Sequence, residues 1–583
     1  MRLDKIGDKF VITCKLSEKE LCREAGFGFD ALGLRKWFTT DWKKAASLIN
    51  IASPDCASYL QNLVDEHEAA LNASYSMYAE ADILVPEMYH PLTGVKLDYL
   101  AYQKAGILYG ENRRRILIGD SPGLGKTIQA IGQINHHGIQ SGLIICPATL
   151  KINWLKEMKK WLYDKSLTVD VAYGNDIPKT DFVIANYDIL KRNADELRRE
   201  QWGIIVPDEA QYLSNPEAGR SQVVLGHWVW DYRKKRHVPK VKPLNAWQWT
   251  FLSGTPMSKR PKDAWGIIRH CDPLDLGRDW NQFAYRYCDA FEGPFGMDAS
   301  GGSNLEELNE KLRKSFMVRR LKANVLKDLP PKTREVIILP PEGLKKLIKS
   351  ERDKFTDSLA MLAAVNNGEE YNPDVAMEDM DPAFVLDTMT TILRGNFDKE
   401  ALGDLAMAGE VEPGFAAYSE ARRELALSKV PMAVEQIKRL VDAGEKVIVF
   451  AIHKDVITRL REAFPPEMSA RIVGGMTAKK VESEKIRFQG YPDEGILPEE
   501  ECKIMFANLK AGGTGHTLTE ATVVLFVEMW SVPSDMEQCE DRAHRYGQLK
   551  NVLVQFLVVD GTMDANTIQT LITRIEMLEK ALD

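Results

Sequence analysis

The chain has 583 residues, which at roughly 150 residues per domain predicts several structural units with separate cores. Its 44% hydrophobic and 27% charged residues are typical of a globular protein, and no apolar run approaches the ~18 to 20 residues that a membrane-spanning helix needs. We therefore exclude a membrane protein. The mixed charges at the start of the chain lack the apolar core of a secretory signal, and we expect an intracellular protein.

Charge and cysteine patterns narrow the function classes. The eight cysteines are scattered without zinc-like spacing, which predicts reduced thiols. The net charge of −8 by itself argues weakly against a nucleic-acid partner, because phosphate binding needs a local positive field. Positive charge nevertheless clusters in residues 232–242 and 313–334, and each cluster is either a solvated face or a phosphate-binding surface.

Residues 1–85 have an aromatic pattern of their own, which predicts a small accessory domain followed by a linker helix. Trp37 and Trp42 flank a short polar stretch. They could form a platform for stacking bases, but packing in a small core is the interpretation that we favour.

From about residue 102 onward, short apolar runs alternate with helical patterns, which is typical of α/β folds with parallel sheets. We predict a first lobe at 86–335, with a helical protrusion near its end, and a second lobe at 429–583. Residues 336–428 are expected to form a helical insertion with an acidic linker. The predicted strands lie within 114–120, 142–148, 181–187, 203–209 and 250–255 of the first lobe, and within 446–452, 470–475, 503–509, 523–529 and 552–559 of the second.

A glycine loop follows the first of these strands and precedes an apolar helix, which is the context of a phosphate-binding loop. In such a loop the backbone amides surround phosphate oxygens, Lys126 would neutralise the β- and γ-phosphates, and the Thr127 hydroxyl would bind Mg²⁺. Asp120 stands where the common pattern has its first glycine, so the match is imperfect. The residues predicted to hold the nucleotide here are Gly123, Leu124, Gly125, Lys126 and Thr127.

Two adjacent carboxylates follow the strand predicted at 203–209. Asp208 would hold Mg²⁺ through water, and Glu209 would orient and deprotonate an attacking water. Pro207 cannot donate a hydrogen bond to a sheet ladder, which predicts that the strand ends there.

In the second lobe, residues 509–515 form a glycine turn after a strand, which is either a structural turn or a phosphate contact. Further along, Gln538, Arg542 and Arg545 are spaced i, i+4 and i+7, which places them on one face of a predicted helix. The two arginines fit an arginine-finger role toward the nucleotide of the first lobe. Salt bridges to Glu540 or Asp541 are the structural alternative.

Several segments together resemble a known family. Residues 208–211, Asp-Glu-Ala-Gln, resemble the DEAD/DEAH box of superfamily-two helicases, and nearly the whole chain after residue 85 resembles the Snf family of ATP-dependent DNA translocases. The resemblance implies two tandem RecA-like lobes, ATP and Mg²⁺ as ligands, and duplex DNA held mainly by its phosphates. The segments that carry it are 102–106, 119–127, 144–149, 208–211, 252–257, 317–334, 509–515 and 533–548.

The resemblance also implies roles for residues that spacing alone does not assign. Gln103 would read adenine, and Gln211, Gly515 and Gln538 would also contact the nucleotide. DNA contacts are expected from Thr149, Asn186, Lys510, Gly512 and Gly513, and from Lys234 and Lys235 of the basic segment. Gln211 replaces the usual histidine and His516 a usual leucine, but an amide can still donate and accept hydrogen bonds.

Segments 87–92 and 283–288 are similar to the HARP-like, fork-remodelling branch of that family. We therefore expect a monomeric DNA-dependent ATPase that translocates on double-stranded DNA and remodels forks or branched DNA, or displaces bound proteins. It would act in the cytoplasm or nucleoid of a prokaryote or virus, or in the nucleus of a eukaryote. A strand-separating helicase and a non-catalytic nucleic-acid-binding scaffold remain alternatives.

Overall fold

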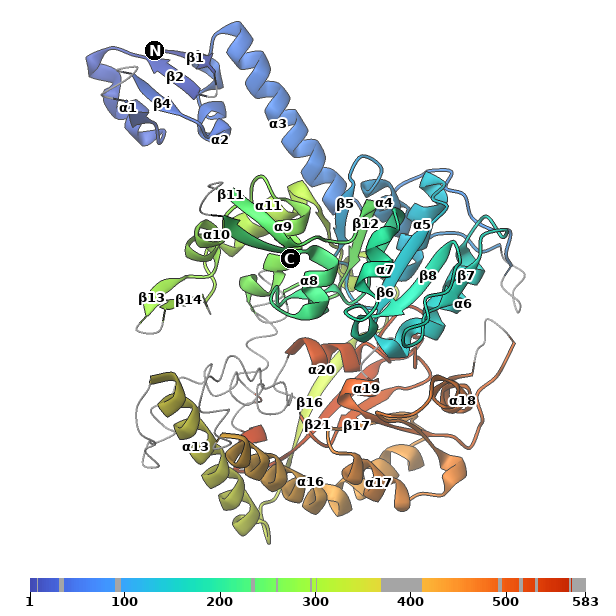
Figure 1. Cartoon of the computed structure of the whole chain (residues 1–583). Coiled ribbons are helices and arrows are strands. Elements are labelled where there is room, and N and C mark those ends of the chain that lie inside the picture. Colours follow the sequence, from blue (N-terminus) through green and yellow to red (C-terminus); the bar gives the residue numbers. More distant parts are fainter. Residues whose placement is uncertain are drawn as a thin grey trace. The chain divides into compact units, whose positions relative to one another are not determined.

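The computed structural model describes residues 1–7, 9–30, 36–89, 96–231, 236–257, 260–293, 296–299, 301–367, 411–490, 495–512, 517–529, 533–565 and 568. The chain forms two compact units. One consists of Met1–Ser76 with Glu310–Ser315, and the other of Met77–Asn309 with Phe316–Asp583. Figure 1 shows their elements.

The smaller unit is an antiparallel sheet with three helices. The strands β1 (Arg2–Ile6), β2 (Lys9–Thr13), β3 (Gly28–Phe29) and β4 (Trp37–Thr39) are ordered β1-β2-β4-β3, and the helices are α1 (Lys19–Glu24), α2 (Trp42–Ala46) and α3 (Pro54–Tyr75). Trp37 and Trp42 pack against its buried core, as the core-packing interpretation predicted.

The first parallel sheet of the larger unit has the order β15-β5-β12-β9-β6-β8-β7. All five strands predicted for this lobe are confirmed, whereas the short β7 and β15 were not predicted. The strands are β5 (Arg115–Ile118), β6 (Gly142–Cys146), β7 (Val169–Val171), β8 (Phe182–Asn186), β9 (Trp202–Pro207), β12 (Ala246–Leu252) and β15 (Met317–Val318). As expected, β9 ends at Pro207.

Helices and two small hairpins accompany this sheet. The helices are α4 (Ala101–Tyr109), α5 (Lys126–His137), α6 (Lys151–Trp161), α7 (Ala194–Arg199), α8 (Gly219–Leu225), α9 (Trp265–Cys271), α10 (Trp280–Tyr287), α12 (Lys322–Val325) and the first part of α11 (Leu305–Ser315), whose residues from Glu310 onward belong to the smaller unit. The hairpins are β10 (His227–Asp231) with β11 (Arg236–Val241), and β13 (Phe291–Gly293) with β14 (Gly296–Asp298). The tip of the first hairpin, with Lys234 and Lys235, lies outside the described residues.

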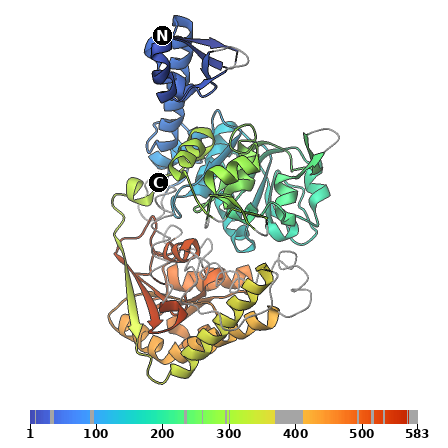
Figure 2. The same cartoon turned by 90° about the vertical axis from the view of Figure 1, so that its left-hand side faces the viewer.

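The second parallel sheet has the order β16-β21-β20-β17-β19-β18. Its strands are β16 (Lys332–Leu339), β17 (Val447–Ala451), β18 (Ser469–Ile472), β19 (Ile504–Asn508), β20 (Val523–Phe526) and β21 (Val552–Val559). Five were predicted. The sixth, β16, pairs along its whole length with β21 and crosses the position 335/336 at which we placed the end of the first lobe. Figure 2 shows it in yellow-green at one edge of this sheet.

Two long helices, α13 (Lys345–Asn367) and α16 (Val411–Asp442), contact each other beside the second sheet. The other helices that the structure describes in this part are α17 (Lys454–Glu462), α18 (Ala478–Gln489), α19 (Leu509–Gly512) and α20 (Pro533–Glu540). The predicted fold class of two parallel-sheet α/β lobes with helical insertions is confirmed by these two sheets. None of the described helices combines the length and the apolar composition that crossing a membrane requires.

Candidate nucleotide site

The phosphate loop connects the end of β5 to the start of α5, as predicted. Gly123 and Gly125 have φ angles of 89° and 73°, a backbone region that side-chain-bearing residues rarely adopt. Between them, the Leu124 side chain is fully buried and anchors the loop. The loop therefore leaves backbone amides near the N-terminus of a twelve-residue helix, where an anion is favoured.

Lys126 begins this helix, and its Nζ donates to the carbonyl oxygen of Asp120 at 2.8 Å. Burial lowers the pKa of the Lys126 ammonium, against the opposing effect of Glu209, Asp120 and Asp208. A partly desolvated cation of this kind gains from a bound phosphate, so the loop fits the group that the sequence predicted for it.

Asp208 and Glu209 follow the end of β9. The indole Nε1 of Trp154 donates to Asp208 Oδ2 at 2.8 Å, and the Tyr187 hydroxyl donates to the Asp208 carbonyl at 2.9 Å. Burial, and secondly the neighbouring Glu209, raise the pKa of Asp208. An ionised carboxylate at this position therefore needs a cation nearby, and Lys126 and a divalent metal both meet that need.

The donor set fits Mg²⁺, which typically takes one or two carboxylates together with substrate phosphates. Asp208 supplies a carboxylate, and Thr127 supplies a hydroxyl on the first turn of α5. Among the described residues there is no cluster of three or more His, Cys, Asp or Glu side chains that could form an all-protein metal cage.

Glu209 is linked by hydrogen bonds to the segment after β12. Its φ of 53° is in the left-handed region, which is uncommon for a residue other than glycine. Gln211 Nε2 donates to Glu209 Oε2 at 2.7 Å, and Gln211 Oε1 accepts from the Ser253 hydroxyl at 2.7 Å. Ser253 Oγ in turn accepts from the backbone N–H of Thr255 at 3.1 Å. The amide of Gln211 thus donates and accepts, as predicted.

Gln103 lies against the phosphate loop from the side of α4. Its Nε2 donates to the Leu124 carbonyl at 3.4 Å, and its Oε1 accepts from the N–H of Leu100 at 2.9 Å. A Cβ atom at Gly125 would lie 2.5 Å from this Nε2, and the φ of 73° also favours glycine at this position. The structure therefore brings Gln103 to the predicted nucleotide loop.

The expected helix face of Gln538, Arg542 and Arg545 is wrong. Helix α20 ends at Glu540, and both arginines lie in the turns that follow it. The helix ends early because the backbone changes to i−3 hydrogen bonds at this point, for example from Arg542 N–H to the Cys539 carbonyl at 3.2 Å.

The two arginines have different surroundings. Arg542 is 5% exposed, and its Nε donates to the Gln538 carbonyl at 2.7 Å. The Cβ atom of Arg545 lies 2.7 Å from where a Cβ on Gly123 would stand, so this residue approaches the phosphate loop closely. Burial, and then the neighbouring Arg542, lower the pKa of Arg545 to about 10.

The salt-bridge alternative named Glu540 and Asp541 as partners, and both carboxylates bind other cations. Glu540 pairs with Lys332 at 2.6 Å and with Arg334 at 2.7 Å. Asp541 pairs with Lys322 at 2.7 Å, and burial lowers the pKa of that lysine to about 8.

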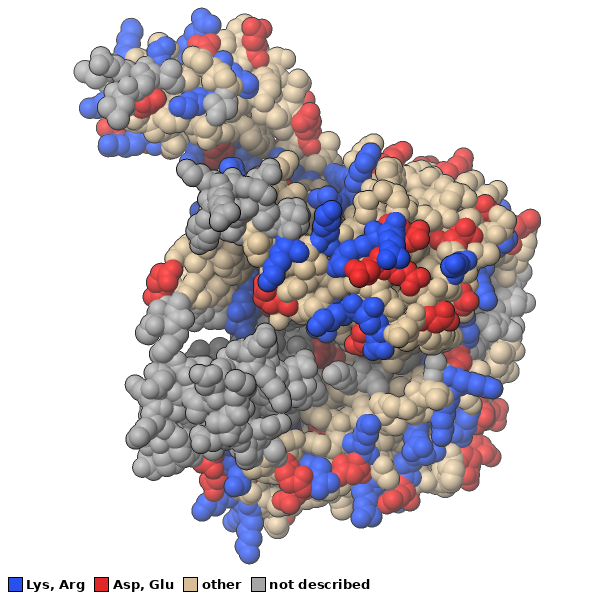
Figure 3. All heavy atoms as spheres, viewed as in Figure 1, with Lys and Arg blue, Asp and Glu red and all other residues tan. Residues whose placement is uncertain are grey.

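The basic cluster 313–334 is neither a solvated face nor an open phosphate-binding surface along its whole length. Arg313 and Arg320 are each 2% exposed and Arg319 is 8% exposed. Arg313 lies over the Tyr75 ring in the smaller unit, Arg319 donates to the Gly119 carbonyl at 2.7 Å, and Arg320 pairs with Asp120. Figure 3 shows that on the visible face of the molecule positive and negative side chains are interspersed.

The predicted DNA contacts are only partly described. Thr149 is exposed after β6, and Asn186 ends β8, where its Nδ2 donates to Asp188 Oδ2 at 3.0 Å. Gly512 is buried at the end of α19. Gly513, Gly515 and His516 lie outside the described residues, as does the side chain of Lys510.

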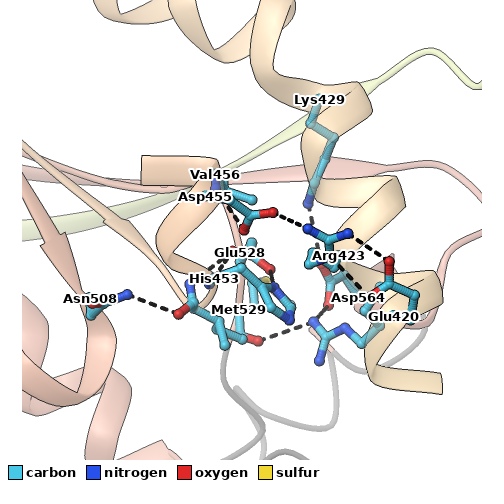
Figure 4. A network of polar contacts seen from close by, with 12 residues as sticks. Glu420, Arg423, Lys429, His453, Asp455, Val456, Asn508, Glu528, Met529 and Asp564 are labelled. Atoms are coloured by element: carbon cyan, nitrogen blue, oxygen red, sulfur yellow. Dashed lines mark hydrogen bonds and ion pairs between the residues drawn. The ribbon is translucent and has the colours of Figure 1, made fainter. Parts of the chain in front are cut away.

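Sequence reasoning missed a polar network at the carboxyl ends of the central strands of the second sheet, which Figure 4 shows. Glu528 accepts hydrogen bonds from the backbone N–H groups of Ile452 and His453, both at 2.9 Å, and contacts His453 Nδ1 at 2.7 Å. Asn508 Nδ2 donates to the Ile452 carbonyl at 2.9 Å. The network thereby holds together the ends of β17, β19 and β20. A polar residue after each apolar strand was the available signal.

The same region fastens α16 to the segment after β21. Arg422 Nη2 donates to Asp564 Oδ1 at 2.6 Å and to the Met529 carbonyl at 3.2 Å. Lys429 Nζ reaches the other oxygen of Asp564 at 3.4 Å. Burial raises the pKa of Glu351, which lies on α13 near Arg422, to about 7.

Comparison with known proteins places these features in a family. The sequence signature of the SNF2-related domain matches residues 37–372, and that of the helicase conserved C-terminal domain matches residues 429–547. A solved structure of the Sulfolobus solfataricus SWI2/SNF2 ATPase core in complex with dsDNA is 20% identical, with a TM-score of 0.36 over 87% of this chain and 95% of that one.

Two relatives match much of this chain but less of their own length. The mouse DNA annealing helicase and endonuclease ZRANB3 is 30% identical over 490 residues, covering 80% of this chain and 39% of that protein. The Xenopus tropicalis SWI/SNF-related matrix-associated actin-dependent regulator of chromatin subfamily A-like protein 1 is 29% identical over 474 residues, covering 80% and 43%. These matches confirm the resemblance to the Snf family and its HARP-like branch. Since the first signature covers more than half of the 583 residues, the chain belongs to the SNF2-related family.

Proposed function

We propose that the chain is a DNA-dependent ATPase that hydrolyses ATP to ADP and phosphate. The observation that carries this proposal is the convergence of the phosphate loop, the Asp208–Glu209 pair and Arg545 within one compact unit. Lys126 would bind the β- and γ-phosphates. Mg²⁺, held by Thr127 and Asp208, would supply charge stabilisation at those phosphates.

Glu209 would orient and deprotonate the attacking water, because its carboxylate lies beside the Asp208 cation site and is held by Gln211. Arg545 would stabilise charge on the transferring phosphoryl group, and Arg542 would support it from its buried position. Gln103 would contact the base from the α4 side of the loop.

We propose further that ATP turnover drives movement on double-stranded DNA, with remodelling of forks or branched DNA as the outcome. Family membership and the relative named as a DNA annealing helicase support this proposal. The interspersed charges on the visible face are compatible with contacts to the phosphate backbone at separate points rather than along one uniform basic surface. The protein would act as a monomer inside the cell, where chromosomal DNA is found.

Two DNA substrates separate translocation from strand separation. A translocase displaces the third strand of a triplex in an ATP-dependent reaction and leaves a plain forked duplex largely intact, whereas a helicase unwinds the fork. We expect triplex displacement by the wild-type chain and none by Glu209→Gln, which keeps the shape of the site but removes the base. Unwinding of the plain fork without triplex displacement would favour the helicase, and DNA binding without ATP turnover would favour the scaffold.

A further inference from the structure

A buried ion pair joins Asp120 of the phosphate loop to Arg320, which lies outside the loop. The Asp120 side chain is fully buried, and that of Arg320 is 1% exposed. Arg320 Nε donates to Asp120 Oδ1 at 3.0 Å, and Arg320 Nη2 donates to Oδ2 at 2.8 Å. The backbone N–H of Arg320 also donates to Oδ1, at 2.9 Å. A residue 200 positions away in the sequence thus binds both oxygens of this loop carboxylate.

The backbone around Arg320 follows the loop. Strand β15 pairs in parallel with β5, and the hydrogen bonds continue beyond the end of both strands. The N–H of Gly119 donates to the Val318 carbonyl at 2.7 Å, and the N–H of Ser121 donates to the Arg320 carbonyl at 3.0 Å. The segment around Arg320 therefore holds the first turn of the phosphate loop in two ways. Backbone hydrogen bonds fix the main chain of the loop, and the Arg320 side chain binds the Asp120 carboxylate.

The other donors of Arg320 reach the helices on both sides of the loop. Its Nη2 donates to Gln129 Oε1 on α5 at 2.9 Å, and its Nη1 donates to the Tyr102 carbonyl on α4. Gln129 Nε2 returns to Asp120 Oδ2 at 2.8 Å. A Cβ at Gly106 would lie 1.9 Å from Gln129 Oε1 and 2.5 Å from Arg320 Nη2, so α4 approaches this group only with glycine there.

We propose that Arg320 is a positioning residue of the nucleotide site, which acts through Asp120, Gln129 and Tyr102. This inference rests on the proposed ATPase function. Lys126 donates to the Asp120 carbonyl, and Gln103 directly follows Tyr102, so a shift of either anchor moves a nucleotide contact. The planar guanidinium binds three partners at once, which a lysine ammonium in the same place does not do.

Arg320→Lys tests this role because it keeps the charge but loses the fork. We expect the KM for ATP to rise about 10-fold, the scale of losing one charge-assisted hydrogen bond, with kcat at saturating ATP within about 3-fold of wild type. The matched control is Arg422→Lys, which weakens the buried pair between Arg422 of α16 and Asp564. It should lower the melting temperature comparably and leave the KM for ATP within about 2-fold.

The results separate three outcomes. Equal KM values in Arg320→Lys and Arg422→Lys would overturn the positioning role and leave a purely structural pair. If Arg320→Lys does not fold, Gln129→Met removes only the bridging amide and should raise KM about 3-fold. An unchanged KM in that variant would also overturn the role. Failure of the wild-type chain to hydrolyse ATP with any DNA would instead refute the ATPase function itself.

Discussion

The two parallel sheets each have a buried arginine–aspartate pair near one edge, and the pairs hold different parts of the chain. In the first, Arg320 binds Asp120 of the glycine loop, and Lys126 of the same loop donates to the Asp120 carbonyl. In the second, Arg422 binds Asp564 and thereby fastens α16 to the segment after β21. The same type of ion pair therefore holds a glycine loop in one lobe and packs a helix in the other.

A second difference lies at the strand ends. Glu528 and Asn508 in the second sheet are bound to neighbouring backbone groups, so their hydrogen-bonding capacity is used within the lobe. Lys126 and Asp208 in the first sheet are desolvated charges, as the lowered pKa of Lys126 and the raised pKa of Asp208 indicate. Such groups cost stability in the free protein and gain most from a charged ligand.

The largest expected effect comes from removing one lysine in each lobe, the partly buried Lys126 and the buried Lys429. Lys126→Ala should abolish ATP turnover and leave the melting temperature unchanged or slightly higher, because the lost ammonium is desolvated. Lys429→Ala should leave ATP turnover unchanged and lower the melting temperature, because Lys429 is 2% exposed and binds Asp564 and the Leu557 carbonyl. Paired turnover and melting measurements test this, and wild-type turnover in Lys126→Ala would remove the phosphate-loop assignment.

Arg545→Ala should lower DNA-stimulated turnover by roughly 10³-fold, the scale of an arginine finger, while ATP affinity stays within several-fold. The physical reason is that Arg545 approaches Gly123 and would act on charge that develops during phosphoryl transfer. We expect the same direction for Arg542→Ala. Single-turnover hydrolysis and nucleotide binding measure the two quantities, and unchanged turnover would make Arg545 a structural cation.

Gln211→Ala should lower DNA-stimulated turnover about 10-fold, because it breaks the hydrogen bonds from Glu209 to Ser253. Gln211→His keeps a donor and an acceptor and should recover most of the rate. Ser253→Ala breaks the same chain one bond further on and is the matched comparison. If duplex DNA stimulated ATP turnover equally in all three variants and the wild type, these hydrogen bonds would have no role in the response of the ATPase site to DNA.

The smallest effect concerns pH and the second lobe. Burial raises the pKa of Glu351 from 4.5 to about 7, so between these values the folded state keeps a proton that the unfolded state has released. Stability from this group is present below about pH 4.5 and is lost as the pH rises through about 7. Glu351→Gln should flatten that decline. Denaturant unfolding at several pH values checks this, and parallel curves for variant and wild type would count against it.

Sequence patterns predicted the strands that are long or uniformly apolar, and they placed Lys126 and Asp208 at strand ends of one predicted sheet. Gln103 was predicted from the family resemblance alone. The patterns missed β15 because its buried apolar run is too short to stand out, and β16 because most of its residues are not buried. β15 has two residues, and β16 is largely exposed although it pairs along its full length with β21. Their place in the sheets is set by pairing with distant strands rather than by local composition.

Long-range ion pairs could not be predicted from the sequence either. Arg320 and Asp120 each appeared in a recognised motif, but only the tertiary structure shows that they bind each other across 200 residues. The prediction that Arg542 and Arg545 share a helix face was wrong for a related reason. Their spacing fits a helix, but the helix ends at Glu540. Spacing predicts a shared face only where the helix continues.

The most direct test of the proposed ATPase site is the rate of ATP hydrolysis by the whole chain. It is measured with and without duplex DNA, and Glu209→Gln is the control. We expect hydrolysis that duplex DNA stimulates at least about 10-fold in the wild type and that is lost in Glu209→Gln, which should still bind ATP. Absence of wild-type hydrolysis, or equal rates in the wild type and Glu209→Gln, would contradict the assignment of this loop and carboxylate pair as an ATPase site.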